Sequence, residues 1–223
     1  TIVSRWLAKS VIAPPLSSEN LQAGGRMHER IVGLYEENAA AFDRMRGRDL
    51  FEKPWLDRFA AALPQGGTVL DIGCGMGEPI AAYLIGLGFR VTGYDSAPSM
   101  IALCRERFPE GEWIVGDMRA LDLGRTFDGV LAWHSSFHLS HDDQRALFPR
   151  FAAHTKPGGY LMFTSGDEEG VRIGEWMNEP LYHASLAPDE YRALLETNGF
   201  EVIHHDPRDP ECGDATVWLA RKL

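Results

Sequence analysis

The sequence predicts an α/β fold in which a mostly parallel sheet is covered by helices on both faces. Three observations carry this prediction. Strand-like and helix-like segments alternate from residue 68 to residue 164, a glycine-rich turn at 73–77 follows the first strand, and two further strand-like runs close the chain through a hairpin-type loop. Strands that alternate with helices are typical of right-handed βαβ units, which build parallel sheets.

The expected elements are bounded by turn residues. Strands are expected at 68–72, 90–94, 112–116, 127–133, 159–164, 200–205 and 215–221. Helices are expected at 28–46, 51–63, 79–87, 98–107, 142–154 and 188–198. Pro188 opens the last helix and Gly199 follows it, which is the usual asymmetry of helix ends. Residues 14–25 and the stretch 166–186 have no regular pattern, so we expect loops there.

Composition narrows the function classes. The chain has 223 residues and a net charge of −10, so it fits one sizeable domain and would repel a polyanion such as nucleic acid. Its three cysteines lack metal-ligand spacing, so we expect no disulfide framework, no metal site and a cytoplasmic location. The apolar runs are too short to span a bilayer, and Lys9 interrupts the apolar start, so we expect no membrane segment and no signal peptide.

The most informative motif is Asp71-Ile72-Gly73-Cys74-Gly75-Met76-Gly77, which begins in the last two residues of the first expected strand. Glycines at such a turn permit positive φ and let a ligand approach the backbone closely. The spacing is D-x-G-x-G-x-G, whereas dinucleotide-binding proteins carry G-x-G-x-x-G. The carboxylate of Asp71 would repel a pyrophosphate, but it can accept a hydrogen bond from a cationic amino group.

This motif resembles the first motif of the class I S-adenosylmethionine-dependent methyltransferases. The resemblance covers about residues 66–222, because that family has a Rossmann-like seven-stranded sheet whose last strand runs antiparallel to the rest. It implies S-adenosyl-L-methionine as cofactor, S-adenosyl-L-homocysteine as product, and direct transfer of a methyl group to an N, O or S atom of a small molecule. It also implies an N-terminal extension (1–25), a helical cap (26–65) and a methyltransferase core (66–223) with an acceptor-covering insertion at about 166–186.

The resemblance assigns the cofactor to the strand ends and the cap. Asp95, at the end of the second strand, accepts the ribose hydroxyls; the alternative is that Asp95 or Ser96 only caps the next helix. The resemblance also implies that Asp117 meets the adenine amino group and that Tyr35 and Arg46 close over the methionine end; the alternatives are an ordinary Asp turn and an amphipathic helix with solvated charges. The full set of implied cofactor-binding residues is Tyr35, Arg46, Asp71, Gly73, Cys74, Gly75, Asp95, Ser96, Met100, Asp117, Met118 and Trp133.

The exit of the fourth strand would face the transferred methyl group. His134 and His138 are the candidate catalytic residues, because imidazole can accept a proton near neutral pH. The alternative is that both only pack or form local hydrogen bonds. The implied acceptor-binding residues are His134, Trp176, Tyr182 and His183, whose rings suit a flat or apolar acceptor. The alternative for the last three is a small core within the insertion.

Three other functions remain open at this point. An NAD-dependent oxidoreductase would share the strand–turn–helix and Asp95, but it does not fit the glycine spacing or Asp71. A methyltransferase of RNA or protein is disfavoured by the negative charge and by the absence of an appended binding module in the sequence. A protein that binds the cofactor without transferring methyl groups is the third alternative. The sequence makes no prediction about oligomeric state.

Overall fold

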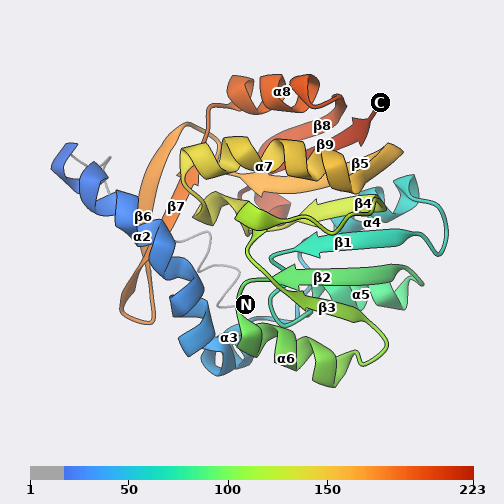
Figure 1. Cartoon of the computed structure of the whole chain (residues 1–223), viewed down its shortest axis with the longest axis horizontal. Coiled ribbons are helices and arrows are strands. Elements are labelled where there is room, and N and C mark those ends of the chain that lie inside the picture. Colours follow the sequence, from blue (N-terminus) through green and yellow to red (C-terminus); the bar gives the residue numbers. More distant parts are fainter. Residues whose placement is uncertain (1–17) are drawn as a thin grey trace.

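The computed structural model describes residues 18–223, and a seven-stranded sheet forms its centre (Figure 1). The strands are β1 (Thr68–Ile72), β2 (Arg90–Asp95), β3 (Glu112–Val115), β4 (Phe127–Ala132), β5 (Thr155–Ser165), β8 (Phe200–Asp209) and β9 (Ala215–Lys222). Their order is β3-β2-β1-β4-β5-β9-β8; β1 to β5 pair in parallel, and β9 is antiparallel to both neighbours. The predicted fold, including the antiparallel last strand, is confirmed.

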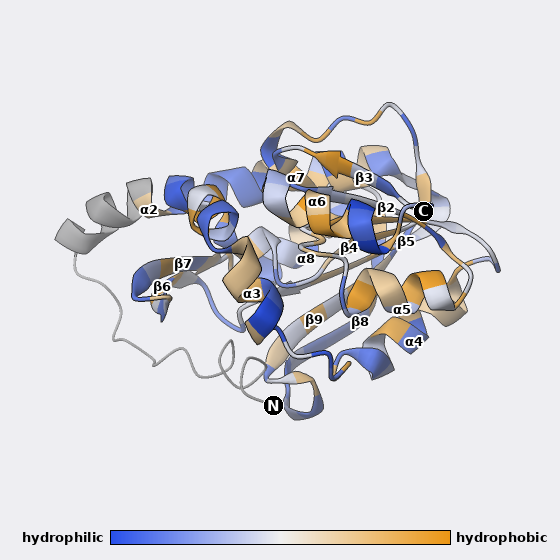
Figure 2. Ribbon diagram, turned by 90° about the horizontal axis from the view of Figure 1, so that it is seen from below, coloured by the Kyte–Doolittle hydropathy of each residue, from blue (hydrophilic) through white to orange (hydrophobic). Residues whose placement is uncertain are grey.

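Helices cover both faces of the sheet. The helices α4 (Lys53–Ala62), α5 (Ile80–Gly86) and α6 (Pro98–Arg107) pack on one face, and α7 (His141–His154) and α8 (Pro188–Thr197) pack on the other. Successive side chains of a strand alternate between the two layers: Val69 of β1 faces the α4 layer and Leu70 faces the α7 layer. Figure 2 shows α4 and α5 side by side on one side of the sheet.

The position of α4 corrects one sequence prediction. We expected residues 51–63 in the cap, but Trp55, Leu56 and Phe59 are buried against the sheet, beside Val69 and Leu131. The apolar spacing of this segment correctly predicts an amphipathic helix. It does not tell which surface the apolar face will meet, and the sheet here offers the larger one.

The N-terminal helix also differs from the prediction. In place of one helix over 28–46, α2 (Ser18–Glu37) and α3 (Ala39–Met45) meet at Asn38. Residues 18–25 are helical, so the expected loop over 14–25 is wrong for that part, and residues 14–17 lie outside the described range. Gly24 and Gly25 lower helix propensity by about 1 kcal/mol each, but they do not prevent helical backbone angles.

The stretch 166–186, expected as a loop, contains a two-stranded antiparallel ribbon. Its strands are β6 (Gly170–Trp176) and β7 (Glu179–Ser185), joined by a turn in which Met177 and Asn178 have φ of 56° and 62°. One face of α2 packs on this ribbon through Ile31 and Leu34 (Figure 1). We call α2, α3 and the β6–β7 ribbon together the cap.

The cap stands at the carboxyl ends of β1, β2 and β4 (Figure 1). The strand order reverses between β1 and β4, and ligands of open α/β sheets bind in the crevice outside such a reversal. The fold therefore directs attention to the space between these strand ends and the cap. No helix within residues 18–223 is long and apolar enough to cross a membrane.

Candidate functional site

One cavity lies between the strand ends and the cap, and it brings the predicted cofactor residues together. All twelve of them line it, and so do His134 and His138. The predicted acceptor residues Trp176, Tyr182 and His183 are not among its lining residues. The placement of these side chains is a structural finding, whereas their roles stay predictions.

The glycine turn is held close to its neighbours by backbone contacts. The amide of Gly73, at φ 76°, donates to the carbonyl of Tyr94 at 2.7 Å. A Cβ at Gly73 would lie 2.3 Å from the Cβ of Ser135, whose hydroxyl donates to the Ile72 carbonyl at 2.7 Å. Only glycine can occupy this position, because both the positive φ and the close approach exclude a side chain. Gly73 therefore lets the turn pack directly against Ser135, which also lines the cavity.

Two carboxylates stand beside the turn, with Asp71 buried and Asp95 half-buried. Burial, and then the charge of Asp95, raise the pKa of Asp71 to about 7. Burial also raises the pKa of Asp95, although backbone hydrogen bonds from Ala97 and Gly75 oppose that shift. Those two amides donate to the Asp95 carboxylate at 2.9 Å each, and Ala97 is the N-cap of α6. Asp95 thus organises the start of α6 and also lines the cavity, and its contact with the ribose stays a prediction.

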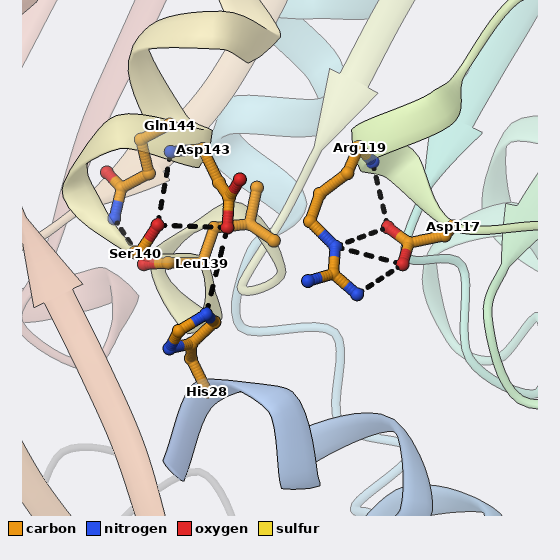
Figure 3. A network of polar contacts seen from close by, with 7 residues as sticks. All are labelled: His28, Asp117, Arg119, Leu139, Ser140, Asp143 and Gln144. Carbon is orange, nitrogen blue, oxygen red and sulfur yellow. Dashed lines mark hydrogen bonds and ion pairs between the residues drawn. The ribbon is translucent and has the colours of Figure 1, made fainter. Parts of the chain in front are cut away.

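Beside Asp117 the cavity is lined by an arginine, Arg119, which the sequence analysis did not single out. Asp117 precedes the short 3-10 helix η1 (Met118–Ala120), and the Nε of Arg119 donates to its two carboxylate oxygens at 3.0 and 2.9 Å (Figure 3). Burial raises the pKa of Asp117, but the hydrogen bonds from Arg119 outweigh it and hold the pKa below its ordinary value. Nothing in the spacing of Asp117 and Arg119 distinguishes this pair from two solvated charges.

Figure 3 also shows the cap meeting the core at the start of α7. His28 of α2 points toward Asp143, with its Nε2 at 3.9 Å from the carboxylate. Asp143 is held by Ser140, the N-cap of α7, whose hydroxyl donates to it at 2.9 Å. His28 lines the cavity, so this contact closes one side of the site.

Two buried nitrogen donors of residues that line the cavity lack partners. Arg46, whose side chain is 9% exposed, donates from Nη2 to Glu52 at 2.8 Å, but its buried Nη1 has no partner among the described residues. The buried Nε1 of Trp133 has none either. Both residues line the cavity. Unpartnered buried donors are costly and call for an acceptor, and a guanidinium suits a carboxylate.

This donor set fits the methionine part of S-adenosylmethionine. Its carboxylate can receive the free hydrogens of Arg46 and Trp133, and its ammonium group can donate to Asp71. The structure therefore contains a complementary group for each end of an amino acid, in a buried site. Among residues 18–223, no group of three or more His, Cys, Asp or Glu side chains is arranged to hold a metal ion.

The two candidate catalytic histidines are neutral at physiological pH. Burial, and then Arg46 and His138, lower the pKa of His134 to about 3. Burial lowers the pKa of His138 to about 4. The Nδ1 of His138 lies 2.8 Å from the Tyr182 carbonyl and its Nε2 lies 3.2 Å from the Tyr35 hydroxyl. This environment fits a neutral ring in which Nδ1 donates and Nε2 accepts, so His138 has no free nitrogen.

The three predicted acceptor residues lie behind the cavity wall. Trp176 stacks on Tyr35 with ring centroids 5.3 Å apart, and His183 packs on His138 at 4.9 Å. Tyr182 contributes its backbone carbonyl to His138. These contacts run to Tyr35 and His138, outside the insertion, so they are not those of a core within the insertion alone, and the acceptor-binding role stays a prediction.

Comparisons with known proteins agree with this geometry. A family model described as a methyltransferase domain matches residues 69–159. A 2-phytyl-1,4-naphtoquinone methyltransferase of Thermosynechococcus vestitus is 33% identical over 216 residues, which cover 79% of this chain and 93% of that protein.

Solved structures share the fold. A 1,6-didemethyltoxoflavin-N1-methyltransferase of Burkholderia thailandensis, with bound 1,6-didemethyltoxoflavin and S-adenosylhomocysteine, has a TM-score of 0.66 at 22% identity, over 96% of this chain and 93% of that one. The S-adenosylmethionine-bound CalS10 of Micromonospora echinaspora, an amino pentose methyltransferase, has a TM-score of 0.64 at 22% identity, over 84% and 96%.

The relative from Thermosynechococcus establishes the family, because its identity of 33% extends along nearly its whole length. The glycine spacing, Asp71 and the strand order agree with it, and the NAD-dependent oxidoreductase alternative is thereby excluded. The family uses S-adenosylmethionine, for which the cavity has complementary groups. This chain belongs to the class I S-adenosylmethionine-dependent methyltransferases.

Proposed function

We propose that the chain methylates a small molecule enclosed between the strand ends and the cap. The observation that carries this proposal is the pair of unpartnered buried donors, Arg46 Nη1 and Trp133 Nε1, in the cavity that also holds the buried carboxylate of Asp71. These groups suit the amino-acid end of the cofactor. Asp95 suits its ribose and Asp117 suits its adenine, so the remaining space, toward the cap, is left for the acceptor.

When bound, S-adenosylmethionine would supply a methyl group on a positively charged sulfur: a lone pair of the acceptor would bond to the methyl carbon while the carbon–sulfur bond breaks and S-adenosylhomocysteine leaves. The protein's own contribution is to hold the two molecules together and to exclude water, and such positioning can supply much of the rate. The cap closes the cavity through His28 on one side and Tyr35 on the other. We propose that these contacts enclose the acceptor.

The lowered pKa values of His134 and His138 favour an acceptor that needs no deprotonation before transfer. A neutral amine carries such a lone pair, whereas a hydroxyl group needs a base. We therefore propose a nitrogen acceptor, with His134 as a hydrogen-bonding group rather than a strong base. His138 would act through Tyr35, and Trp176, Tyr182 and His183 would support these two side chains from behind.

We also propose that the chain is divided into a cap and a core, and that it is located in the cytoplasm. The cap of α2, α3 and the β6–β7 ribbon covers the acceptor, and residues from α4 onward, except that ribbon, form the core. The net charge of −10 disfavours a nucleic-acid acceptor. The cysteines Cys74, Cys104 and Cys212 are free thiols, the form that the reducing cytoplasm maintains.

The test is calorimetric titration with S-adenosylmethionine, S-adenosylhomocysteine and NAD, followed by a methyl-transfer screen of amines, phenols and thiols read by mass spectrometry. We expect binding of the two sulfur compounds alone, and its loss in Asp71→Ala and Asp95→Ala. Asp189→Ala, which removes an exposed carboxylate from α8, is the matched control and should bind normally. Binding without transfer to any acceptor would favour the non-catalytic alternative, and transfer to phenols alone would contradict a nitrogen acceptor.

A further inference from the structure

We propose that Glu52 is a positioning residue, which orients the guanidinium of Arg46 for the carboxylate of the cofactor. The inference rests on the proposed function, in which Arg46 receives that carboxylate. Glu52 does not line the cavity and no sequence motif includes it. Its effect on the ligand would therefore pass entirely through Arg46.

The burial of Glu52 is the first observation. The residue is 0% exposed, and its Oε1 accepts from Nη2 of Arg46 at 2.8 Å. Glu52 precedes α4, and its backbone carbonyl accepts from the amides of Trp55 and Leu56. Its side chain makes no capping hydrogen bond to the helix, so the carboxylate is directed to Arg46 instead.

The second observation is how little freedom Arg46 retains. It ends α3, where its backbone amide donates to the Phe42 carbonyl at 2.7 Å, and its guanidinium carbon lies 5.9 Å from the ring centroid of Phe51. Phe51 and Glu52 both come from the segment that leads into α4. With Nη2 engaged by Glu52, the free Nη1 is the nitrogen that remains for a ligand in the cavity.

The third observation is that the pair is incomplete without a ligand. Arg46 Nη1 and Glu52 Oε2 are both buried and both lack a hydrogen-bond partner among the described residues. Buried ion pairs contribute little to stability compared with apolar residues of similar volume, and less when their remaining polar atoms are unsatisfied. A ligand carboxylate that accepts a hydrogen bond from Nη1 would give the Arg46 guanidinium its missing partner.

The charge balance indicates what Glu52 contributes. Arg46 and Glu52 together are neutral, so the pair would attract a carboxylate by directed hydrogen bonds rather than by a net positive field. Removing the carboxylate of Glu52 would strengthen the field and weaken the orientation. If orientation dominates, as we propose, the loss of Glu52 weakens the binding of the carboxylate.

Two ligands separate this role from a general structural one. S-adenosylhomocysteine carries the amino-acid group, and 5′-methylthioadenosine lacks it but keeps the adenosine part. We would titrate both into the unmodified chain, Glu52→Ala, Glu52→Gln and Arg46→Ala by calorimetry, with circular dichroism to verify folding. The readout is the ratio of the two dissociation constants in each variant.

We expect Glu52→Ala to raise the dissociation constant of S-adenosylhomocysteine by about tenfold, which corresponds to the loss of one charge-assisted hydrogen bond. The dissociation constant of 5′-methylthioadenosine should change by less than about twofold. Glu52→Gln should weaken the binding of S-adenosylhomocysteine less, because the amide oxygen can still accept a hydrogen bond from Nη2 of Arg46. Equal weakening of both ligands, or no change in either, would overturn the proposal. If Glu52→Ala does not fold, an unchanged ratio in Glu52→Gln overturns it.

Arg46→Ala separates the two proposals. If it leaves the ratio unchanged, Arg46 does not receive the carboxylate and the proposed cofactor geometry fails. If Arg46→Ala reduces the preference for S-adenosylhomocysteine over 5′-methylthioadenosine and Glu52→Ala does not, the proposed cofactor geometry stands and the positioning role of Glu52 fails.

Discussion

The substitution Asp71→Asn should weaken cofactor binding, because the amide oxygen is a poorer acceptor for the ammonium group than a carboxylate, and at the same time stabilise the free protein. Asp71 is 3% exposed, and burial raises its pKa from 3.8 to about 7. The folded chain therefore holds the proton more tightly than the unfolded chain, so the carboxylate lowers stability as the pH rises from about 4 to above 7. The shift corresponds to about 4 kcal/mol at pH 7.5, an upper limit because Asn keeps a polar group there.

The assay is urea unfolding of both proteins at pH 7.5 and pH 5. The gain in unfolding free energy should shrink to about 2 kcal/mol at pH 5, where the Asp71 carboxyl is protonated in the folded chain. Asp128→Asn is the matched control with the opposite sign. Burial alone would raise the pKa of Asp128, but hydrogen bonds from Thr68 and Lys156 lower it below the ordinary value, so that substitution should destabilise. A destabilised Asp71→Asn, or a gain independent of pH, would refute the reasoning.

Three further predictions follow from the site and the cap. Because the ammonium group needs the ionised form of Asp71, whose pKa is about 7, affinity for S-adenosylhomocysteine should fall about fivefold from pH 7 to pH 6 in calorimetric titrations, and this change should vanish in Asp71→Asn. Gly73→Ala should abolish the binding of S-adenosylhomocysteine and strongly lower the melting temperature, because its Cβ would lie 2.3 Å from the Cβ of Ser135. The control Gly124→Ala also has a positive φ but meets no neighbouring atom, so it should lower the free energy of unfolding by only about 1–2 kcal/mol in thermal unfolding. Trp176→Ala should destabilise the packing of the cap by about 3 kcal/mol and therefore speed the release of S-adenosylhomocysteine in stopped-flow measurements.

The sheet and the glycine turn could be predicted because their signals are local. Each parallel strand is a short apolar run that ends at a turn residue, and the strand ends come together by topology. Asp71, Asp95 and Asp117 each lie within two residues of the end of a strand, so the sequence alone predicts that they meet at one edge of the sheet. Arg46 and Tyr35 required the family resemblance, because a helix pattern alone does not place a cap.

The β6–β7 ribbon could not be predicted, for two reasons. Gly174 and Pro180 interrupt the strand pattern, although proline is tolerated at the edge of a two-stranded ribbon. The turn places Met177 at positive φ, where glycine or asparagine is usual, so only Asn178 carried a turn signal. The ribbon is stabilised instead by α2, more than a hundred residues earlier in the chain, and such packing leaves no trace in a local window.

The pair of Arg46 and Glu52 illustrates a further limit. The two residues are six positions apart, across the end of one helix and the start of another, which is a spacing that fits no helical pairing rule. Composition favours solvated positions for both. Their burial follows from where α4 packs, and α4 is the helix that we expected in the cap.

The unsatisfied polar atoms of the structure reveal how stability and function are divided. Of the buried side-chain nitrogens without partners among the described residues, those of His28, Arg46 and Trp133 line the cavity. Each such atom costs about 1–3 kcal/mol in the free protein, and Asp71 adds the cost of a buried carboxyl. A ligand with a carboxylate and an ammonium group removes several of these costs at once. The residues that bind the charged groups of the ligand should therefore lower the stability of the ligand-free protein. Gly73 and Trp176, which shape the cavity, should instead contribute to both folding and binding.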